Sequence, residues 1–158
     1  MRVFLIVGGA GFIGSHFTRF LVQQGDAVHV LVRPSTDLSR LEGFMNDISV
    51  HVCDLDNTSM LGSIFSSIQP DVVVHMAATS RSFGKDSLFE SSKLALDSVR
   101  NLMNILSVTA DMARPPSLFL RTGSIAEYGD CPLPCSEAQA LQPRTPYAAG
   151  KVFENFLT

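Results

Sequence analysis

Apolar residues fall into five short runs along the chain, and longer amphipathic segments separate these runs. Each run is rich in aliphatic side chains and short enough for a buried strand. The predicted strands cover residues 3–7, 27–32, 49–55, 71–76 and 117–121. The predicted helices cover residues 15–24, 58–67 and 87–113, and a further helix begins at 147. We expect a short helix or loop over 37–44 and a polar loop over 79–86.

Strands that alternate with helices, without an internal repeat or linker, predict an α/β fold with a doubly wound parallel sheet. The 158 residues fit one domain, 1–158. Hydrophobic residues make up 46% of the chain and charged residues only 17%. This balance is typical of a sheet covered by helices on both faces, so we expect three layers, α/β/α.

A glycine-rich turn joins the first predicted strand to the first helix, with Gly8, Gly11 and Gly14 three residues apart. In a nucleotide-binding βαβ unit these glycines permit a sharp turn, backbone approach to a pyrophosphate, and close helix packing. The N–H groups of the first helical turn then point at the anion. A turn that merely connects two elements is the alternative, but the strand–turn–helix order favours a Rossmann-like dinucleotide site that includes Phe12 and Ile13.

The end of the second strand bears on which dinucleotide is bound. An NAD site usually carries Asp or Glu about 20 residues after the glycines, whereas this strand ends in Arg33, with Ser35 and Thr36 close behind. Arginine pairs with a 2′-phosphate that a carboxylate would repel. We therefore expect NADP in preference to NAD. The open alternatives are that Arg33 is a solvated loop residue or stacks on the adenine.

Two other strand ends supply candidate cofactor contacts, because ligands of this fold lie at the carboxyl ends of the strands. Asp54 and Leu55 end the third strand, where the adenine can lie against Leu55. Asp54 is equally well a helix N-cap or a turn residue. Ala77 and Ala78 follow the fourth strand, and their small side chains let the chain pass close to the ribose and phosphates. His75 is expected to be buried rather than catalytic.

Ser124, Tyr147 and Lys151 form the candidate catalytic group. Ser124 follows the fifth strand, and Tyr147 and Lys151 lie four residues apart on one face of the last helix. A free tyrosine has a pKa of about 10, and a nearby ammonium with an oxidised nicotinamide favours the phenolate. Lowering that pKa to about 7 requires interactions that favour the phenolate over the phenol by ~4 kcal/mol. Tyr147 can then exchange a proton with a substrate hydroxyl that Ser124 holds. Lys151 would also orient the nicotinamide ribose.

Several motifs together resemble those of one family. They are GGAGFIGSH at 8–16, CDL at 53–55, HMAA at 75–78, Ser124 to Tyr128-Gly129, and Ser136-Glu137 followed by Pro146-Tyr147-Ala-Ala-Gly-Lys151. The chain resembles an extended short-chain dehydrogenase/reductase of the NAD(P)-dependent epimerase/dehydratase type. The resemblance implies an enzyme that acts on a nucleotide-activated sugar by epimerisation, dehydration or reduction. A ketone reductase for a non-sugar substrate and a dinucleotide-binding module without turnover are the alternatives.

Three positions depart from the usual pattern of this family. Val7 stands where Thr or Ser often precedes the first glycine, and Ala95 stands near the position of an Asn in the long helix. Residues 121–123 replace a run of small hydroxyl residues before Ser124. These departures bear on turnover rather than on cofactor binding. A dehydratase of the family also needs an acid/base pair just after the serine, where Glu127 is the one carboxylate, so dehydration is the less expected reaction.

Members of the resembled family continue for about as long again beyond the position of Thr158. The resemblance therefore implies an N-terminal portion without the last strands and most of the substrate-binding part, and little turnover by this portion alone. The last helix would then lack cover on its aliphatic face, which carries Val152, Phe153, Phe156 and Leu157. Family members often dimerise through helices, one of which corresponds to 87–113, so a homodimer is expected.

The net charge of −3 and the low pI of 5.7 argue against a basic nucleic-acid groove or polybasic membrane attachment. No apolar run reaches membrane-spanning length, and the first residues lead directly into a strand without a signal peptide, so we expect a cytoplasmic protein. Three cysteines give no disulfide framework, and Cys131 and Cys135 have no further ligand at metal-binding spacing. We expect free thiols and no metal.

Overall fold

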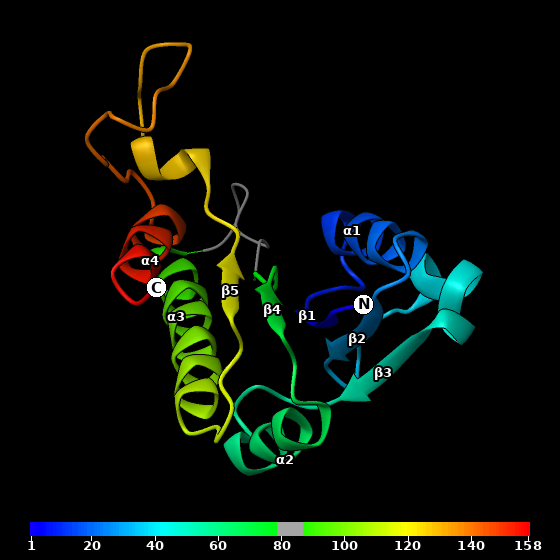
Figure 1. Ribbon diagram of the computed structural model, residues 1–158. Coiled ribbons are helices and arrows are strands. Elements are labelled where there is room, and N and C mark those ends of the chain that lie inside the picture. Colours follow the sequence, from blue (N-terminus) through cyan, green and yellow to red (C-terminus); the bar gives the residue numbers. More distant parts are fainter. Residues whose placement is uncertain (79–86) are drawn as a thin grey trace. The chain divides into compact units, whose positions relative to one another are not determined.

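The computed structural model describes residues 1–78 and 87–158, so the loop expected over 79–86 lies outside the described residues. Strands and helices alternate along the chain as the sequence predicts (Figure 1). The strands are β1 (Val3–Val7), β2 (Ala27–Val32), β3 (Ile48–Val52), β4 (Val72–His75) and β5 (Leu118–Arg121). The helices are α1 (Phe12–Gln23), α2 (Thr58–Ile68), α3 (Leu88–Ala110) and α4 (Pro146–Asn155), with 3-10 helices η1 (Ser39–Asp47) and η2 (Ile125–Tyr128).

These residues divide into two compact units. Unit 1 comprises residues 1–77 and 104–121, and unit 2 comprises residues 78–103 and 122–158. Helix α3 contributes its first part to unit 2 and its last turns to unit 1. Within the described ranges, no helix is both long and apolar enough to cross a membrane.

Unit 1 contains one parallel sheet with the strand order β3-β2-β1-β4-β5. The central strand β1 pairs with β2 on one side, where Val3 lies opposite Ala27, and with β4 on the other, where Phe4 lies opposite Val72. Strands β3 and β5 continue the sheet outward in the same direction. The order reverses at β1, which confirms the doubly wound parallel sheet.

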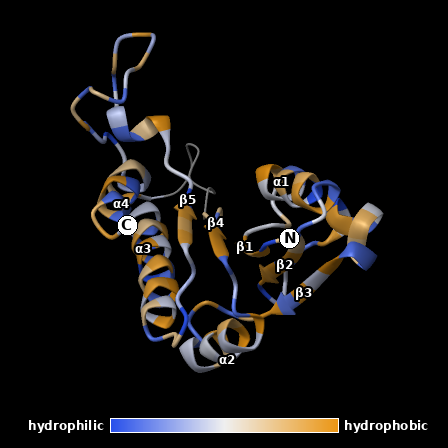
Figure 2. Cartoon of the chain, viewed as in Figure 1, coloured by the Kyte–Doolittle hydropathy of each residue, from blue (hydrophilic) through white to orange (hydrophobic). Residues whose placement is uncertain are grey.

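Both faces of this sheet are buried, and β1 shows why its sequence reads as a continuous apolar run. Phe4 and Ile6 face a cluster that includes Leu21 of α1 and residues of η1. Leu5 and Val7 face the opposite cluster, which includes Phe65 of α2 and residues of α3. Strands β4 and β5 are coloured largely as hydrophobic in Figure 2. Burial of each Leu, Ile or Phe side chain contributes about 1.5–3 kcal/mol, so the sheet holds its helices on both sides.

The observed boundaries differ from the predicted ones where a turn begins earlier than the apolar pattern indicates. Strand β3 ends at Val52, because Asp54 forms a turn in which its carbonyl accepts the N–H of Asn57 at 3.0 Å. The side chain of Asn57 caps α2 by accepting the N–H of Met60 at 3.1 Å. Asp54 is thus a turn residue, and Asn57 is the N-cap. Helix α1 begins at Phe12, directly after the glycine turn.

In unit 2, α4 packs closely against the first part of α3. Thr145 caps α4 by accepting the N–H of Ala148 at 3.1 Å, and Pro146 occupies the first turn. A Cβ atom placed on Gly150 would lie 3.2 Å from the Cβ of Ala95, so small residues at both positions permit the close contact. The residue that departs from the family pattern, Ala95, therefore lies at the contact between the two helices.

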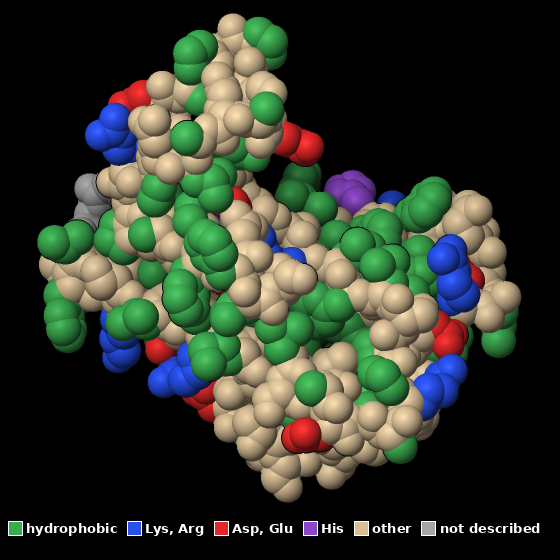
Figure 3. Space-filling view, turned by 60° about the vertical axis from the view of Figure 1, so that its left-hand side comes forward, with side chains coloured by type: hydrophobic (Ala, Val, Ile, Leu, Met, Phe, Trp, Pro, Cys, Tyr) green, Lys and Arg blue, Asp and Glu red, His purple; other side chains and the backbone are tan. Residues whose placement is uncertain are grey.

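Exposed apolar side chains lie on α3 and α4. Phe153 of α4 and Phe156, the residue directly after that helix, are exposed, whereas Val152 and Leu157 are half-buried, so only part of the expected aliphatic face lacks cover. Figure 3 shows hydrophobic side chains at the surface, with acidic and basic groups dispersed among them and no single basic face in this view.

The cysteines correct one prediction. Cys131 and Cys135 form a disulfide with their Cα atoms 5.9 Å apart, so the expectation of free thiols was wrong for this pair. Cys53 is free and buried, as expected. Burial, together with the nearby charge of Asp54, raises the pKa of its thiol and keeps it protonated at neutral pH.

Candidate active site

The turn between β1 and α1 has a backbone that only glycine allows at two positions. Gly8 has a φ of 92°, and a Cβ atom there would lie 2.6 Å from the backbone nitrogen of Ala77, beyond the end of β4. A Cβ atom on Gly14 would overlap the carbonyl oxygen of Gly8, because the first turn of α1 lies directly against the glycine turn. These are the sharp turn and the close helix packing expected for the first and third glycines.

The start of α1 leaves its first N–H groups available to a ligand. Gly11 is the N-cap and has no side chain to accept from them, and no acidic residue occupies the first turn. Phe12 and Ile13 follow it and are exposed. Orphan N–H groups and the positive end of the helix dipole attract an anion. The residues present therefore fit a pyrophosphate at this turn.

The residues after β2 form a turn that carries both a cation and a carboxylate. The N–H of Arg33 donates to the hydroxyl of Thr36 at 3.1 Å, and the N–H of Thr36 donates back to the carbonyl of Arg33 at 3.0 Å. The Arg33 side chain is exposed. Asp37, which the sequence analysis overlooked, accepts the N–H of Ser39 at 2.9 Å. That hydrogen bond lowers the pKa of the Asp37 carboxyl, which is therefore ionised at neutral pH.

The other predicted cofactor contacts lie at the ends of β3 and β4. Leu55 is buried among the residues that cover the sheet, and its carbonyl accepts the side-chain amide of Asn104 at 2.9 Å. Its contact with an adenine stays a prediction. His75 is 1% exposed, which confirms the expected buried histidine. Ala77 lies against the glycine turn, while Ala78, the first residue of unit 2, is exposed.

Ser124 begins η2 as part of a capping box. Its hydroxyl accepts the N–H of Ala126 at 3.2 Å, and Glu127 accepts the N–H of Ser124 at 2.7 Å. The second carboxylate oxygen of Glu127 accepts the side-chain amide of Asn155 at 2.6 Å. As an acceptor in the box, the Ser124 hydroxyl keeps its hydrogen for donation. Glu127 is 4% exposed, and both of its oxygens are bound by protein groups.

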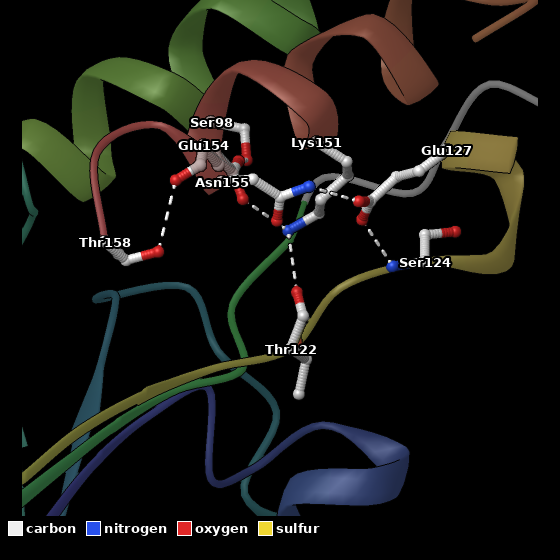
Figure 4. Close-up of polar contacts among 8 residues, drawn as sticks. All are labelled: Ser98, Thr122, Ser124, Glu127, Lys151, Glu154, Asn155 and Thr158. Carbon is white, nitrogen blue, oxygen red and sulfur yellow. Dashed lines mark hydrogen bonds and ion pairs between the residues drawn. The ribbon is translucent and has the colours of Figure 1, made fainter. Parts of the chain in front are cut away.

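Helix α4 carries Tyr147 and Lys151 four residues apart, and a buried polar cluster fixes Lys151 (Figure 4). Tyr147 is half-buried, whereas Lys151 is 3% exposed. The Lys151 ammonium donates to Glu154 at 2.8 Å and to the carbonyl of Thr122 at 3.4 Å. Glu154 is 0% exposed, and its other oxygen accepts the hydroxyl of Ser98 on α3 at 2.9 Å. A buried ammonium needs such a partner, because an isolated charge is costly away from water.

Three residues with polar contacts on or beside α4 were not predicted from the sequence: Ser98, Glu154 and Asn155. Glu154 follows Lys151 by three residues, and the spacing alone places the two side chains on one face of a helix. The serine and glutamate at 124 and 127 likewise match the capping-box pattern, which links Ser124 to Glu127 locally. No local pattern links Ser98 to Glu154, because 56 residues separate them.

The sheet order, the glycine turn before α1 and the Tyr147–Lys151 pair on α4 together define an extended short-chain dehydrogenase/reductase. Residues 5–158 match the family described as GDP-mannose 4,6 dehydratase, and the chain belongs to that family.

Relatives of the chain include both dehydratases and epimerases. GDP-mannose 4,6 dehydratase 2 of Arabidopsis thaliana is 30% identical over 169 residues, which cover 99% of this chain and 45% of that protein. UDP-glucose 4-epimerase of Mycoplasma genitalium is 31% identical over 126 residues, which cover 78% of this chain and 36% of the epimerase. The chain thus spans less than half the length of these two relatives.

Solved structures show the same fold. The UDP-glucose 4-epimerase of Brucella ovis, in complex with NAD, has a TM-score of 0.85 and 26% identity, over 99% of this chain and 46% of the epimerase. The UDP-Glc/GlcNAc 4-epimerase of Campylobacter jejuni has a TM-score of 0.83 and 25% identity, over 99% of this chain and 48% of that enzyme. Rossmann-like architecture and family membership are therefore confirmed.

Proposed function

We propose that the chain is the cofactor-binding portion of an NAD(P)-dependent enzyme that converts a nucleotide-activated sugar, with Tyr147 as general acid/base. The observation that carries this proposal is the Lys151 ammonium, which protein contacts hold in place on α4, four residues after Tyr147. Epimerases and dehydratases of nucleotide sugars among the relatives support the substrate class.

The glycine turn, the start of α1 and Ala77 would hold the pyrophosphate of the dinucleotide. Gly8 supports this role because a side chain there would meet Ala77 and leave less room at the turn. Arg33, Asp54, Leu55 and Ala78 are proposed as further contacts. A bound nicotinamide supplies an acceptor or donor of hydride.

Proton movement falls to residues of unit 2. Tyr147 takes the proton of a substrate hydroxyl in the oxidative direction and returns it in the reductive direction. The Ser124 hydroxyl donates a hydrogen bond to the same substrate oxygen, and the capping box fixes the backbone of Ser124. Lys151 favours the phenolate form of Tyr147 through its charge.

The reaction is proposed to be epimerisation or reduction rather than dehydration. A dehydratase needs a further acid/base pair beyond Ser124, and Glu127 is the single carboxylate in that segment. Its oxygens accept hydrogen bonds from Ser124 and Asn155, which favours a structural role. A homodimer formed through α3 and a cytoplasmic location stay predictions.

A Tyr147→Phe substitution tests the proposed mechanism, in a form of the protein that includes a substrate-binding portion. Because general acid/base catalysis contributes about 10²–10⁴-fold, we expect kcat to fall by at least 100-fold with little change in cofactor affinity. Tyr128→Phe is the matched control, since it removes the other tyrosine hydroxyl of the chain. Unchanged turnover in the Tyr147 variant would remove this residue from the mechanism.

The preference for NADP over NAD is a separate proposal and rests on Arg33. Nicotinamide fluorescence can follow titration of NADPH and NADH into the 158-residue chain. We expect NADPH to bind more tightly, and Arg33→Ala to weaken NADPH by about tenfold, the equivalent of ~1.4 kcal/mol, with little effect on NADH. Arg40→Ala is the control, because Arg40 is also an exposed arginine that follows β2. The Asp37 carboxylate in the same turn would repel a 2′-phosphate and therefore favours NAD. Tighter binding of NADH than of NADPH by the parent chain would overturn the proposal.

A dinucleotide-binding module without turnover is the second candidate. Ala95 favours it, because this residue stands near the position of an asparagine in many family members and packs against Gly150 instead. Cofactor binding without any turnover, in a form of the protein that includes a substrate-binding portion, would support this candidate.

A further inference from the structure

The segment that joins η2 to α4 in unit 2 is an exposed loop, drawn in orange in Figure 1. No side chain in the fully described range 130–145 is buried. The loop is closed at its base, where the carbonyl of Glu127 accepts the N–H of Gln142 at 2.9 Å. A Cβ atom on Gly129 would overlap the carbonyl oxygen of Gln142, so the two backbone segments touch there. We call residues 130–141 the crosslinked loop, because a disulfide lies within it.

The base of the crosslinked loop is tied to the Ser124 turn and leads directly into α4. Glu127, whose carbonyl accepts from the far end of the loop, also accepts the N–H of Ser124 with its carboxylate at 2.7 Å. On the other side, the chain continues to Thr145, the N-cap of α4, two residues before Tyr147. The loop therefore lies between the two residues to which we assign the proton chemistry.

The disulfide of this loop is accessible and spans few residues. Cys131 and Cys135 are both half-buried and lie four residues apart. A disulfide that closes so short a loop restricts the unfolded chain less than a long-range disulfide does, so the fold adds little resistance to its reduction. Pro132 and Pro134 fix the φ angle of two of the three intervening residues. The thiols therefore stay close together after reduction and can pair again.

Gln139 lies where it can bind the reduced form of Cys135. The sulfur of Cys135 is 3.2 Å from the side-chain oxygen of Gln139. A sulfur in a disulfide has no hydrogen to donate, whereas a thiol donates its S–H weakly. The same oxygen accepts the N–H of Ser136 at 3.0 Å, and an amide oxygen has a second lone pair for the thiol. Reduction would thus add a hydrogen bond within the loop at a site that already holds its acceptor.

We propose that Cys131 and Cys135 form a redox modification site: a dithiol reductant opens the disulfide reversibly, Gln139 accepts the Cys135 thiol, and the crosslinked loop between the Ser124 turn and α4 is released. A thiolate of the dithiol attacks Sγ of Cys131, and the bond to Sγ of Cys135 breaks. The second thiolate of the dithiol then attacks its own partner sulfur and releases Cys131. Two electrons and two protons pass from the dithiol to the cysteines, and the dithiol becomes a disulfide.

The redox equilibrium of the 158-residue chain tests the modification site. The chain is equilibrated in a series of buffers of reduced and oxidised dithiothreitol or glutathione, and free thiols are alkylated and located by peptide mass spectrometry. We expect labels to appear together on Cys131 and Cys135, and to disappear again on reoxidation. A pair that stays a disulfide, or stays reduced, in every buffer would overturn the proposal.

Substitution of Gln139 tests its part in the equilibrium. Gln139→Ala removes the acceptor of the Cys135 thiol and is expected to favour the disulfide roughly threefold, the effect of one weak hydrogen bond. Gln142→Ala is the matched control, because its exposed side chain is removed while its backbone N–H still bonds Glu127; its equilibrium should match that of the parent. An unchanged equilibrium in Gln139→Ala would overturn the assignment of this residue.

Proteolysis measures whether reduction releases the loop. Glu137 is exposed within the crosslinked loop, and a protease that cleaves after glutamate can act there. Because cleavage follows the population of the open form, we expect reduction with dithiothreitol to speed it about tenfold at Glu137. Cleavage at Glu42, an exposed residue of η1 in unit 1, should not change.

A Cys131→Ser/Cys135→Ser variant is the matched control for this cleavage. It should be cut at Glu137 as fast as the reduced parent, with or without dithiothreitol. Equal cleavage of the oxidised and reduced parent at Glu137 would overturn the proposal. These measurements need no cofactor or substrate, so their failure is distinguishable from a failure of the proposed reaction.

Discussion

The glycine turn of unit 1 and the Lys151 cluster of unit 2 depend on opposite kinds of chemistry. The glycine turn and the start of α1 in unit 1 work through backbone groups and through the missing side chains of Gly8, Gly11 and Gly14. The Lys151 cluster of unit 2 is made of buried polar side chains that satisfy one another, because Glu154 bonds both Ser98 and Lys151. Nearby along the chain, the exposed Asn155 bonds the buried Glu127. An added methyl group should damage the first, whereas a removed charge should damage the second.

This difference follows from what each part has to bind or hold. Backbone N–H groups can approach an anion closely only where no side chain intervenes, so the turn is built from glycine. A phenol that acts as a base needs a positive charge at a fixed position nearby. When that charge is buried, protein groups must replace the hydrogen bonds that water would make. The cluster therefore ties α4 to both α3 and η2.

The largest effect is expected when one partner of the buried ion pair is removed. Lys151→Met leaves the Glu154 carboxylate buried without its ammonium, and we expect a loss of about 3–5 kcal/mol in the free energy of unfolding. Adding Glu154→Gln should restore most of this loss, because no charge then remains buried at the pair. Urea unfolding at neutral pH measures both variants. Equal destabilisation of the single and double variants would show that packing rather than charge dominates.

A smaller effect is expected in the glycine turn, where Gly8→Ala and Gly25→Ala form a matched pair. Both glycines have a positive φ, 92° and 78° respectively, and this conformation costs a residue with a Cβ atom roughly 1–2 kcal/mol. The new Cβ meets Ala77 at position 8 and open space at position 25. We therefore expect a larger loss of stability for Gly8→Ala, and a loss of NAD(P) binding for this variant alone. Retained cofactor binding in Gly8→Ala would contradict the role of the turn.

The smallest effect concerns a pair of histidines on neighbouring strands of the sheet in unit 1. His29 of β2 and His51 of β3 lie with Nδ1 and Nε2 2.9 Å apart. Burial lowers the pKa of both imidazoles below the usual 6.5, and for His29 the charge of His51 adds to it. Below that pH the unfolded chain binds more protons than the folded one, so stability should fall as pH decreases through about 6.5 and stay level above it.

Urea midpoints at about pH 7.5 and pH 5.5 measure this slope around the usual histidine pKa. A His29→Gln/His51→Gln variant should lose the slope because glutamine does not titrate. A slope that persists in that variant would assign the pH dependence to other groups.

Sequence patterns predicted the strands and helices of unit 1 well, because apolar residues recur along the sequence at the spacing with which a strand or helix buries its side chains. The run at 3–7 has the length of a buried strand, and the glycines at 8, 11 and 14 fix the turn that follows. The main boundary errors arose at turns. The predicted strand at 49–55 included Asp54, but β3 ends at Val52, and Asp54 belongs to the turn before the N-cap Asn57. Such turns depend on hydrogen bonds between neighbouring residues rather than on hydropathy.

By itself, the sequence determined the alternation of strands and helices, the glycine turn and the placement of Tyr147 and Lys151 on one face of α4. Each of these depends on residues close together along the chain. The tertiary structure alone decided that Ser98 meets Glu154 and that Asn155 meets Glu127, across 56 and 28 residues. These contacts form only when α4 packs against α3 and η2, so no local period or spacing encodes them.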